Sequence, residues 1–172
     1  MMRLAEEKDL VQIDQIYEEI LDYEAETVSY TNWQKGLYPT LAYAKTALDQ
    51  RTLYVGEDGD GVYGCVILNA AQPDEYGEID WQIAAKPEEV IVIHTLCVRP
   101  SAYGRGLGRQ MVAFCEDYAK RKNAKVIRLD TYEGNAPACA MYPKLGYSFA
   151  GIAKFHFQNV IWENLKCFEK EM

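Results

Sequence analysis

The sequence predicts an α/β (α+β) fold built on a mixed central sheet of about seven strands. Residues 90–98 are almost all apolar or β-branched, which is typical of a buried strand. From Leu107 onward, apolar residues recur at the spacing of an amphipathic helix. A stretch with alternating glycines joins the two segments. A buried strand therefore passes directly into a helix, and the remaining segments alternate in the same way.

The first half of the chain predicts two helices between short strands. The expected elements are a strand at 2–5, helices at 9–25 and 40–50, and a hairpin of strands at 52–56 and 62–71. Asp9 is the expected N-cap of the first helix. Residues 24–39 form a polar and aromatic loop, and residues 72–89, broken by prolines and a glycine, predict a long connection.

The second half predicts alternating strands and helices. After the strand at 90–98 we expect a helix at 107–122, a strand at 125–131, a helix at 135–145 and strands at about 147–158 and 160–169. The whole order is β-α-α-β-β-β-α-β-α-β-β. Neither repeats nor a linker interrupt it, so residues 1–172 are expected to form a single domain.

Composition narrows the class of protein. A net charge of -8 argues against nucleic-acid binding, which requires a basic face. The chain has no apolar run of about 18 residues and no apolar core of a secretory signal, so we expect a cytoplasmic protein that does not enter a membrane. Five scattered cysteines and two histidines predict reduced, mostly buried thiols and no metal site.

The glycine-rich junction predicts an anion-binding loop. Gly104, Gly106 and Gly108 permit backbone conformations closed to other residues and let a ligand approach main-chain amides. These amides precede a helix, whose dipole favours anions at its N-terminus. A dinucleotide-binding motif does not fit, because its third glycine would fall on Arg109, and the Gly-Lys-Ser/Thr of a P-loop is missing. A pyrophosphate is the expected ligand, and a plain turn that starts a helix is the alternative.

From about Ile91 to Gly151 the sequence resembles the GNAT superfamily of N-acetyltransferases. That superfamily carries Gln/Arg-x-x-Gly-x-Gly/Ala at this junction, followed by Asn-x-x-Ala-x-x-x-Tyr and a short turn with Gly-Phe/Tyr. Here Asn135, Ala138 and Tyr142 have this spacing, and Gly146-Tyr147 follow. The chain departs from the pattern at Tyr103, where Gln or Arg is usual. The expected source of the missing charge is one of three arginines, Arg99, Arg105 or Arg109.

The resemblance implies that acetyl-CoA is the co-substrate and that an amine attacks it directly. It implies that pantetheine pairs with the main chain of Leu96, Cys97 and Val98. It places the pyrophosphate on Gly104, Arg105, Gly106, Leu107, Gly108 and Arg109, with a further contact from Asn135, which also begins a helix as its cap. It gives Tyr142 the role of proton donor to the leaving sulfur, with a packing tyrosine as the alternative.

Two residues are candidates for the base that deprotonates the amine. His94 is the first candidate, because His94-Thr95-Leu96-Cys97-Val98 resembles the His-x-Leu-x-Val strand of arylalkylamine N-acetyltransferases, and histidine titrates near neutral pH. Asp130 is the second, five residues before Asn135, where some protein N-terminal acetyltransferases carry a catalytic glutamate. A core histidine and a structural acid at a strand end are the alternatives.

The acceptor is predicted less sharply. Tyr30, Trp33 and Trp81 are the expected walls of its site, because aromatic rings and nearby carboxylates suit a cationic amine. A small amine or amino-acid-like acceptor is favoured, and a protein N-terminus or lysine is the alternative. A non-catalytic CoA-binding sensor is a further alternative. A homodimer through the last strands is compatible with each, although Phe155, Phe157, Val160 and Trp162 are first expected to complete the core.

Overall fold

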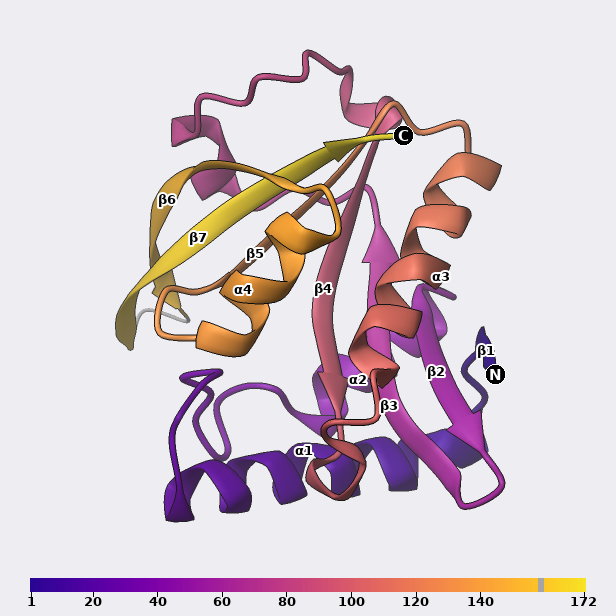
Figure 1. The fold of residues 1–172 in the computed structure, drawn as a ribbon. Helices are drawn as coiled ribbons and strands as arrows, with labels where there is room; N and C mark the ends of the chain where they lie inside the picture. Colours follow the sequence, from indigo (N-terminus) through magenta and orange to yellow (C-terminus); the bar gives the residue numbers. More distant parts are fainter. Residues whose placement is uncertain (158–159) are drawn as a thin grey trace. The chain divides into compact units, whose positions relative to one another are not determined.

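The computed structural model describes residues 1–157 and 160–172. The described residues form a seven-stranded sheet in the order β1-β2-β3-β4-β5-β7-β6 (Figure 1). The elements are β1 (Met2–Leu4), α1 (Leu10–Glu26), α2 (Leu41–Asp49), β2 (Leu53–Asp58), β3 (Gly61–Asn69), β4 (Val90–Val98), α3 (Leu107–Arg121), β5 (Val126–Tyr132), α4 (Ala136–Lys144), β6 (Ser148–Phe157) and β7 (Ile161–Glu171). The predicted fold class and element order are confirmed. Residue 158, the predicted end of the strand at 147–158, lies outside the described residues.

The sheet is mixed, as predicted. β4 and β5 run parallel, while the pairs β1–β2, β2–β3, β5–β7 and β6–β7 are antiparallel. The chain divides into two compact units. Unit 1 contains residues 1–29, 33–68 and 94–115, and unit 2 contains residues 30–32, 69–93 and 116–172. β4 and α3 each contribute residues to both units, and a single domain over residues 1–172 stays a prediction.

In unit 1, helices cover both faces of the β2–β3 hairpin. Buried residues of α1 and α2 pack with alternate residues of the strands in one cluster, which includes Ile13, Ile16, Ile20, Ala44, Ala47, Leu53, Val55, Cys65 and Ile67. On the other face, Tyr54 packs on Phe114 of α3 with ring centroids 5.3 Å apart. A β-carbon at Gly64 would lie 2.3 Å from the Cys97 carbonyl oxygen, so glycine permits the close approach of β3 to β4.

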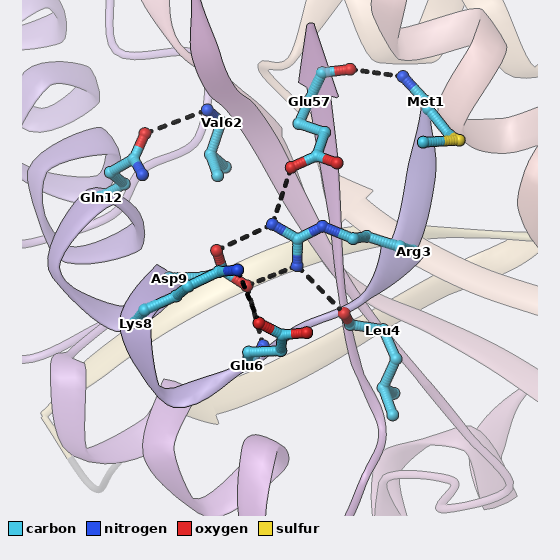
Figure 2. Close-up of polar contacts among 9 residues, drawn as sticks. All are labelled: Met1, Arg3, Leu4, Glu6, Lys8, Asp9, Gln12, Glu57 and Val62. Carbon is cyan, nitrogen blue, oxygen red and sulfur yellow. Dashed lines mark hydrogen bonds and ion pairs between the residues drawn. The ribbon is translucent and has the colours of Figure 1, made fainter.

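An ion-pair network at the chain's start involves Asp9, which holds the predicted N-cap position of α1 (Figure 2). The Asp9 side chain makes no hydrogen bond as the N-cap of α1. Its carboxylate instead accepts hydrogen bonds from both Nη atoms of Arg3, at 2.6 and 2.9 Å, and from the Glu6 amide at 2.8 Å. Arg3 also donates to Glu57 of β2 at 2.7 Å. Asp9 is 1% exposed, and its carboxylate ties β1 to the turn that precedes α1.

In unit 2, β5 is flanked by β7 and the first half of β4. Val90–Ile93 pair with Val126–Leu129, and the β5–β7 ladder runs from Val126–Glu171 to Tyr132–Leu165. On one face lies α4 (Figure 1). There Tyr142 contacts Phe168 of β7. On the other face, the connection over residues 72–89 contributes Tyr76 and Ile79 to a buried cluster with Val126, Ala153, Leu165 and Cys167. The predicted irregular connection therefore forms part of the core.

The last strands complete the core only in part. Phe155 is buried, as expected, but Val160 and Trp162 are 64% and 60% exposed. The side chain of Phe157 lies outside the described part of the chain. All five cysteines are described; none of them forms a disulfide bond, and four are buried. None of the helices in the described residues has the length and apolar character needed to span a bilayer.

We expect Asp9→Ala to lower the free energy of unfolding by roughly 2 to 4 kcal/mol, because it strips Arg3 of its buried partner and the Glu6 amide of its acceptor. Arg3 lowers the pKa of Asp9, so this stabilisation is present above the pKa of the unfolded state and is lost as pH falls through the folded value. Lys8→Ala is the control, because its pair with Glu6 is exposed and should contribute little to stability. Urea denaturation at pH 7 measures both; equal losses would contradict the assignment.

Candidate active site

The glycine loop adopts left-handed backbone conformations before α3. Gly104 and Gly106 have φ angles of +77° and +75°. A β-carbon at either position would meet nothing within 4 Å. Glycine is therefore favoured here by the left-handed backbone conformation and not by steric crowding. Residues 103–106 are exposed, and α3 continues for 15 residues from Leu107. Gly108 already lies in the first turn of α3.

The three arginines near this loop differ in their partners. Arg99 donates to both carboxylate oxygens of Glu19 on α1, from Nη2 at 2.6 Å and Nε at 3.1 Å. Arg105 pairs with Asp58 at 3.0 Å in an exposed position, while Arg109 is exposed on α3. An exposed pair of this kind contributes little and exchanges readily for another anion. Arg105 and Arg109 are therefore better placed than Arg99 to meet a phosphate.

Tyr103 has the character of a neutral phenol. Its ring packs edge-on to that of Tyr23, with centroids 5.6 Å apart. Desolvation by burial raises its pKa further above neutrality. The position where Gln or Arg was expected thus holds a hydrogen-bonding group without charge.

β4 changes its pairing and its backbone conformation partway along. Among the described residues, its ladder with β5 ends at Ile93–Leu129. Thr95 has a φ of +49°, which is rare for a β-branched residue and interrupts the extended strand. The Thr95 hydroxyl hydrogen-bonds that of Tyr38. His94, directly before this interruption, is half-buried.

The three residues that are predicted to contact pantetheine follow Thr95. Leu96 and Val98 are half-buried, while Cys97 is buried with its Sγ 3.6 Å from that of Cys65. The Arg99 amide donates to the Tyr63 carbonyl of β3 at 2.8 Å. This half of β4 is therefore fixed by β3 and by the thiol contact.

The predicted acceptor walls have packing roles of their own. In unit 1, Trp33 lies edge-on to Tyr17 and Tyr38, with centroids 6.4 and 5.8 Å apart. In unit 2, Trp81 contacts Tyr76, and its Nε1 donates to the Tyr76 carbonyl at 2.9 Å. Tyr30 is half-buried in the same unit. Contact of these three residues with an acceptor stays a prediction.

Asn135 and Tyr142 lie at the start and near the end of α4. The Asn135 side chain accepts a hydrogen bond from the Ala138 amide at 3.1 Å, which confirms its predicted role as a cap. Tyr142 is buried, and its ring centroid lies 5.4 Å from that of Tyr147 and 5.8 Å from that of Phe168. Packing on two sides fixes the direction of its phenol.

Asp130 lies on the opposite face of the β5–β7 pair from Tyr142. Phe168, which contacts Tyr142, pairs with Leu129, and successive strand residues point to opposite faces. The Tyr76 hydroxyl donates to Asp130 Oδ2 at 2.8 Å. Burial raises the pKa of Asp130 to about 6, the Tyr76 hydrogen bond opposes that rise, and the negative charges of Glu163 and Glu75 add to it. A carboxylate with this pKa suits proton transfer near neutral pH.

A second carboxylate near Asp130 was not predicted. Glu163 of β7 accepts a hydrogen bond from the Asn32 side chain at 2.8 Å, and burial raises its pKa. Sequence reasoning also did not single out Tyr76 as a partner of Asp130. Both residues lie far from Asp130 in sequence, and no periodicity marks them. Among the described residues, we find no group of three or more His, Cys, Asp or Glu side chains able to hold a metal ion.

Comparisons with known proteins agree on one family. The model of the acetyltransferase (GNAT) family matches residues 13–147. A streptothricin acetyltransferase of Escherichia coli is 31% identical over 78 residues, which are 45% of this chain and 41% of that protein. The chain thus matches about two fifths of the length of this curated relative.

Solved structures extend the similarity to the whole fold. A GNAT-family acetyltransferase of Streptococcus agalactiae superposes with a TM-score of 0.83 at 19% identity, over 100% of this chain and 95% of that one. A Salmonella typhimurium protein solved with its cofactor acetyl-CoA gives a TM-score of 0.70 at 18% identity, over 99% and 92% of the two chains. At these identities the structures support the fold alone.

We expect Asp130→Asn to stabilise the protein at alkaline pH. The pKa of Asp130 is about 6 in the folded state and 3.8 for a free aspartate, so ionisation of Asp130 opposes folding. This destabilisation is absent below pH 4 and complete above pH 6. The variant should gain roughly 2 to 3 kcal/mol at pH 8 and nothing at pH 3.5. Urea denaturation at both pH values measures this, with the exposed Asp80→Asn as control. A gain independent of pH would contradict it.

Proposed function

Because the chain belongs to the acetyltransferase (GNAT) family, we propose that it moves an acetyl group from acetyl-CoA to a primary amine by direct attack. The observation that carries this proposal is the loop before α3, where Gly104 and Gly106 are left-handed and exposed. A helix N-terminus after an open glycine loop offers main-chain amides and a favourable dipole to a pyrophosphate.

The residues of unit 1 fit the co-substrate in charge and shape. The missing β-carbons at positions 104 and 106 leave open space within 4 Å, so a phosphate can approach the main chain. Arg105 and Arg109 supply positive charge at the exposed side of the loop. We assign pyrophosphate binding to residues 104–109 and pantetheine pairing to Leu96–Val98. From unit 2, we assign a contact with the co-substrate to Asn135. When bound, the thioester supplies the activated acetyl group.

Two side chains of unit 2 suit the proton transfers that acetylation requires. We propose that Asp130 accepts the proton of the acceptor ammonium and that Tyr142 protonates the leaving sulfur. The hydrogen bond from Tyr76 and the pKa near 6 support Asp130 as the base. The buried, doubly packed ring supports Tyr142, because a fixed neutral phenol donates in a defined direction. His94 is the alternative base.

Charge favours a cationic acceptor. Asp130 and Glu163 are carboxylates in a partly desolvated region of unit 2, where they attract an ammonium group more strongly than they would in water. We therefore propose a small amine or an amino-acid-like acceptor. A peptide N-terminus or lysine side chain carries the same charge and is the alternative substrate. The streptothricin acetyltransferase relative supports acetylation of a small molecule.

We expect Gly106→Val to weaken acetyl-CoA binding at least about tenfold, because a β-branched residue disfavours the left-handed conformation that opens the loop. Gly36→Val is a matched control: Gly36 has a φ of +74° and open space around it, in the loop before α2. Both variants should lose similar stability. Calorimetric titration with acetyl-CoA distinguishes them, and equal affinities would refute the assignment of the loop.

We expect Tyr142→Phe to slow thiol release from acetyl-CoA by about 100-fold and to leave acetyl-CoA affinity within about twofold, since it removes only the proton donor. The ring remains, so packing against Phe168 is preserved. Tyr147→Phe removes a neighbouring hydroxyl and should leave the rate unchanged. Full activity of Tyr142→Phe would exclude it as the acid.

A further inference from the structure

We propose that Tyr76 is a positioning residue for the base. Its hydroxyl holds one carboxylate oxygen of Asp130 and thereby directs the other toward the acceptor ammonium. This inference rests on the proposed function, in which Asp130 accepts the proton. The Tyr76 Oη–Asp130 Oδ2 distance of 2.8 Å is that of a good hydrogen bond. Within the described part of the chain, Asp130 Oδ1 has no such bond.

Tyr76 is itself held firmly. It lies in the short 3₁₀ helix Asp74–Glu78 and is 3% exposed. Its ring contacts that of Trp81 at a centroid distance of 5.0 Å, and the Trp81 indole N–H donates to the Tyr76 carbonyl oxygen at 2.9 Å. One tryptophan thus fixes both the ring and the backbone of Tyr76. The hydroxyl therefore has a defined position over β5.

A buried ion pair anchors this arrangement to the sheet. The guanidinium of Arg128 lies over the Trp81 ring, 4.2 Å from its centroid, and faces Glu169 with an Nε–Oε2 distance of 3.5 Å. Arg128 also donates to the Gln72 side chain at 2.8 Å and to the Ile83 carbonyl at 3.0 Å. Residues near both ends of the 72–83 segment are thus bound to one side chain of β5. Since Arg128 and Asp130 are two residues apart, they share a face of the strand.

Glu169 secures the same segment from β7. One of its carboxylate oxygens accepts hydrogen bonds from the amides of Gln82 and Ile83, at 2.6 and 3.1 Å. Glu169 is paired in register with Arg128 across the two strands. A chain of contacts therefore runs from Glu169 through Arg128, Trp81 and Tyr76 to Asp130. A connection needed only to join two strands does not require two buried charges and a contact between two aromatic rings.

The proton step uses this geometry directly. An N–H bond of the acceptor ammonium breaks and its proton moves to Asp130 Oδ1. The carboxylate becomes a neutral acid, and the amine keeps the lone pair that attacks the acetyl carbon. Tyr76 donates to Oδ2 before and after the transfer, so the carboxyl group does not rotate. The other titratable or charged groups that act on this pair are Glu75, Glu163, Cys167 and Arg128.

The test is direct titration of the Asp130 carboxyl carbon by NMR in the full chain, with Asp130→Asn to assign the signal. Tyr76→Phe keeps the ring on Trp81 but removes the donor. We expect its Asp130 midpoint to rise by about one pH unit, because the lost hydrogen bond favoured the carboxylate. Tyr147→Phe, a buried tyrosine on the α4 side, should leave the midpoint unchanged. A midpoint unmoved in Tyr76→Phe would overturn the proposal.

Kinetics separates positioning from mere packing. In Tyr76→Phe the acid limb of kcat/KM for an amine should move to higher pH with the NMR midpoint, while acetyl-CoA affinity stays constant. Trp81→Phe keeps a ring but loses the indole N–H, so it should shift the NMR midpoint and the acid limb in the same direction by a smaller amount. It replaces Tyr76→Phe in the test if that variant does not fold. An acid limb that follows His94→Ala and ignores Asp130→Asn would overturn the proposal.

Failure of the proposed function gives a different result. Wild-type protein that binds no acetyl-CoA, or that releases no thiol with any amine, would refute the function even where Tyr76→Phe shifts the Asp130 midpoint. The role of Tyr76 in positioning a base would then fall with it. A wild-type enzyme with an unshifted Tyr76→Phe profile would refute the positioning role alone.

Discussion

The left-handed backbone of Thr95, inside β4, is the constraint on which the change of pairing along this strand depends. The φ of +49° at Thr95 departs from the extended conformation, and the ladder with β5 does not continue beyond Ile93, although β4 itself runs to Val98. Before this point, Val90–Ile93 pair with β5 and belong to unit 2; after it, Leu96–Val98 belong to unit 1 and lead into the glycine loop. The hydroxyl of Tyr38 contacts that of Thr95 and supports a conformation that a threonine alone would avoid.

Unit 2 buries charged side chains at a cost to the free energy of folding. Burial raises the pKa of both Asp130 and Glu163, so each carboxylate destabilises the folded chain when it ionises. Arg128 and Glu169 bury a further pair of charges beneath the 72–83 segment. Buried charges are weak contributors to stability, and perturbed carboxylates gather at functional sites. Asp130 and Glu163, whose ionisation costs folding free energy, are therefore also the carboxylates that the proposed function uses.

How far the sequence could predict this protein depended on the range of each interaction. Helix and strand periodicity is local, so the order of elements and the Asn135 cap were predicted correctly. The N-cap position of Asp9 was also predicted from its local context, but the partner of its side chain was not, because Arg3 lies on β1 and bridges to Glu57 on β2. Contacts that join distant segments leave no local pattern.

The candidate site shows the same limit. The glycine loop was found because strand, glycines and helix are contiguous, and the family resemblance supplied Tyr142. Tyr76 and Glu163 lie 54 and 33 residues from Asp130, in segments without a motif. Trp33 and Trp81 each pack on neighbouring tyrosines, which was not predicted, and their contact with an acceptor stays a prediction. Exposure and packing of an aromatic side chain depend on tertiary contacts and cannot be read from its position in a loop.

The central claim is that this chain binds acetyl-CoA and transfers its acetyl group to an amine. The most direct measurement is thiol release from acetyl-CoA across a panel of small amines, amino acids and short peptides, with acetyl-CoA binding titrated in parallel. We expect saturable binding of acetyl-CoA. We also expect thiol release with at least one cationic amine and no thiol release with neutral alcohols. The absence of acetyl-CoA binding would contradict the central claim, because the glycine loop would then have no pyrophosphate to hold.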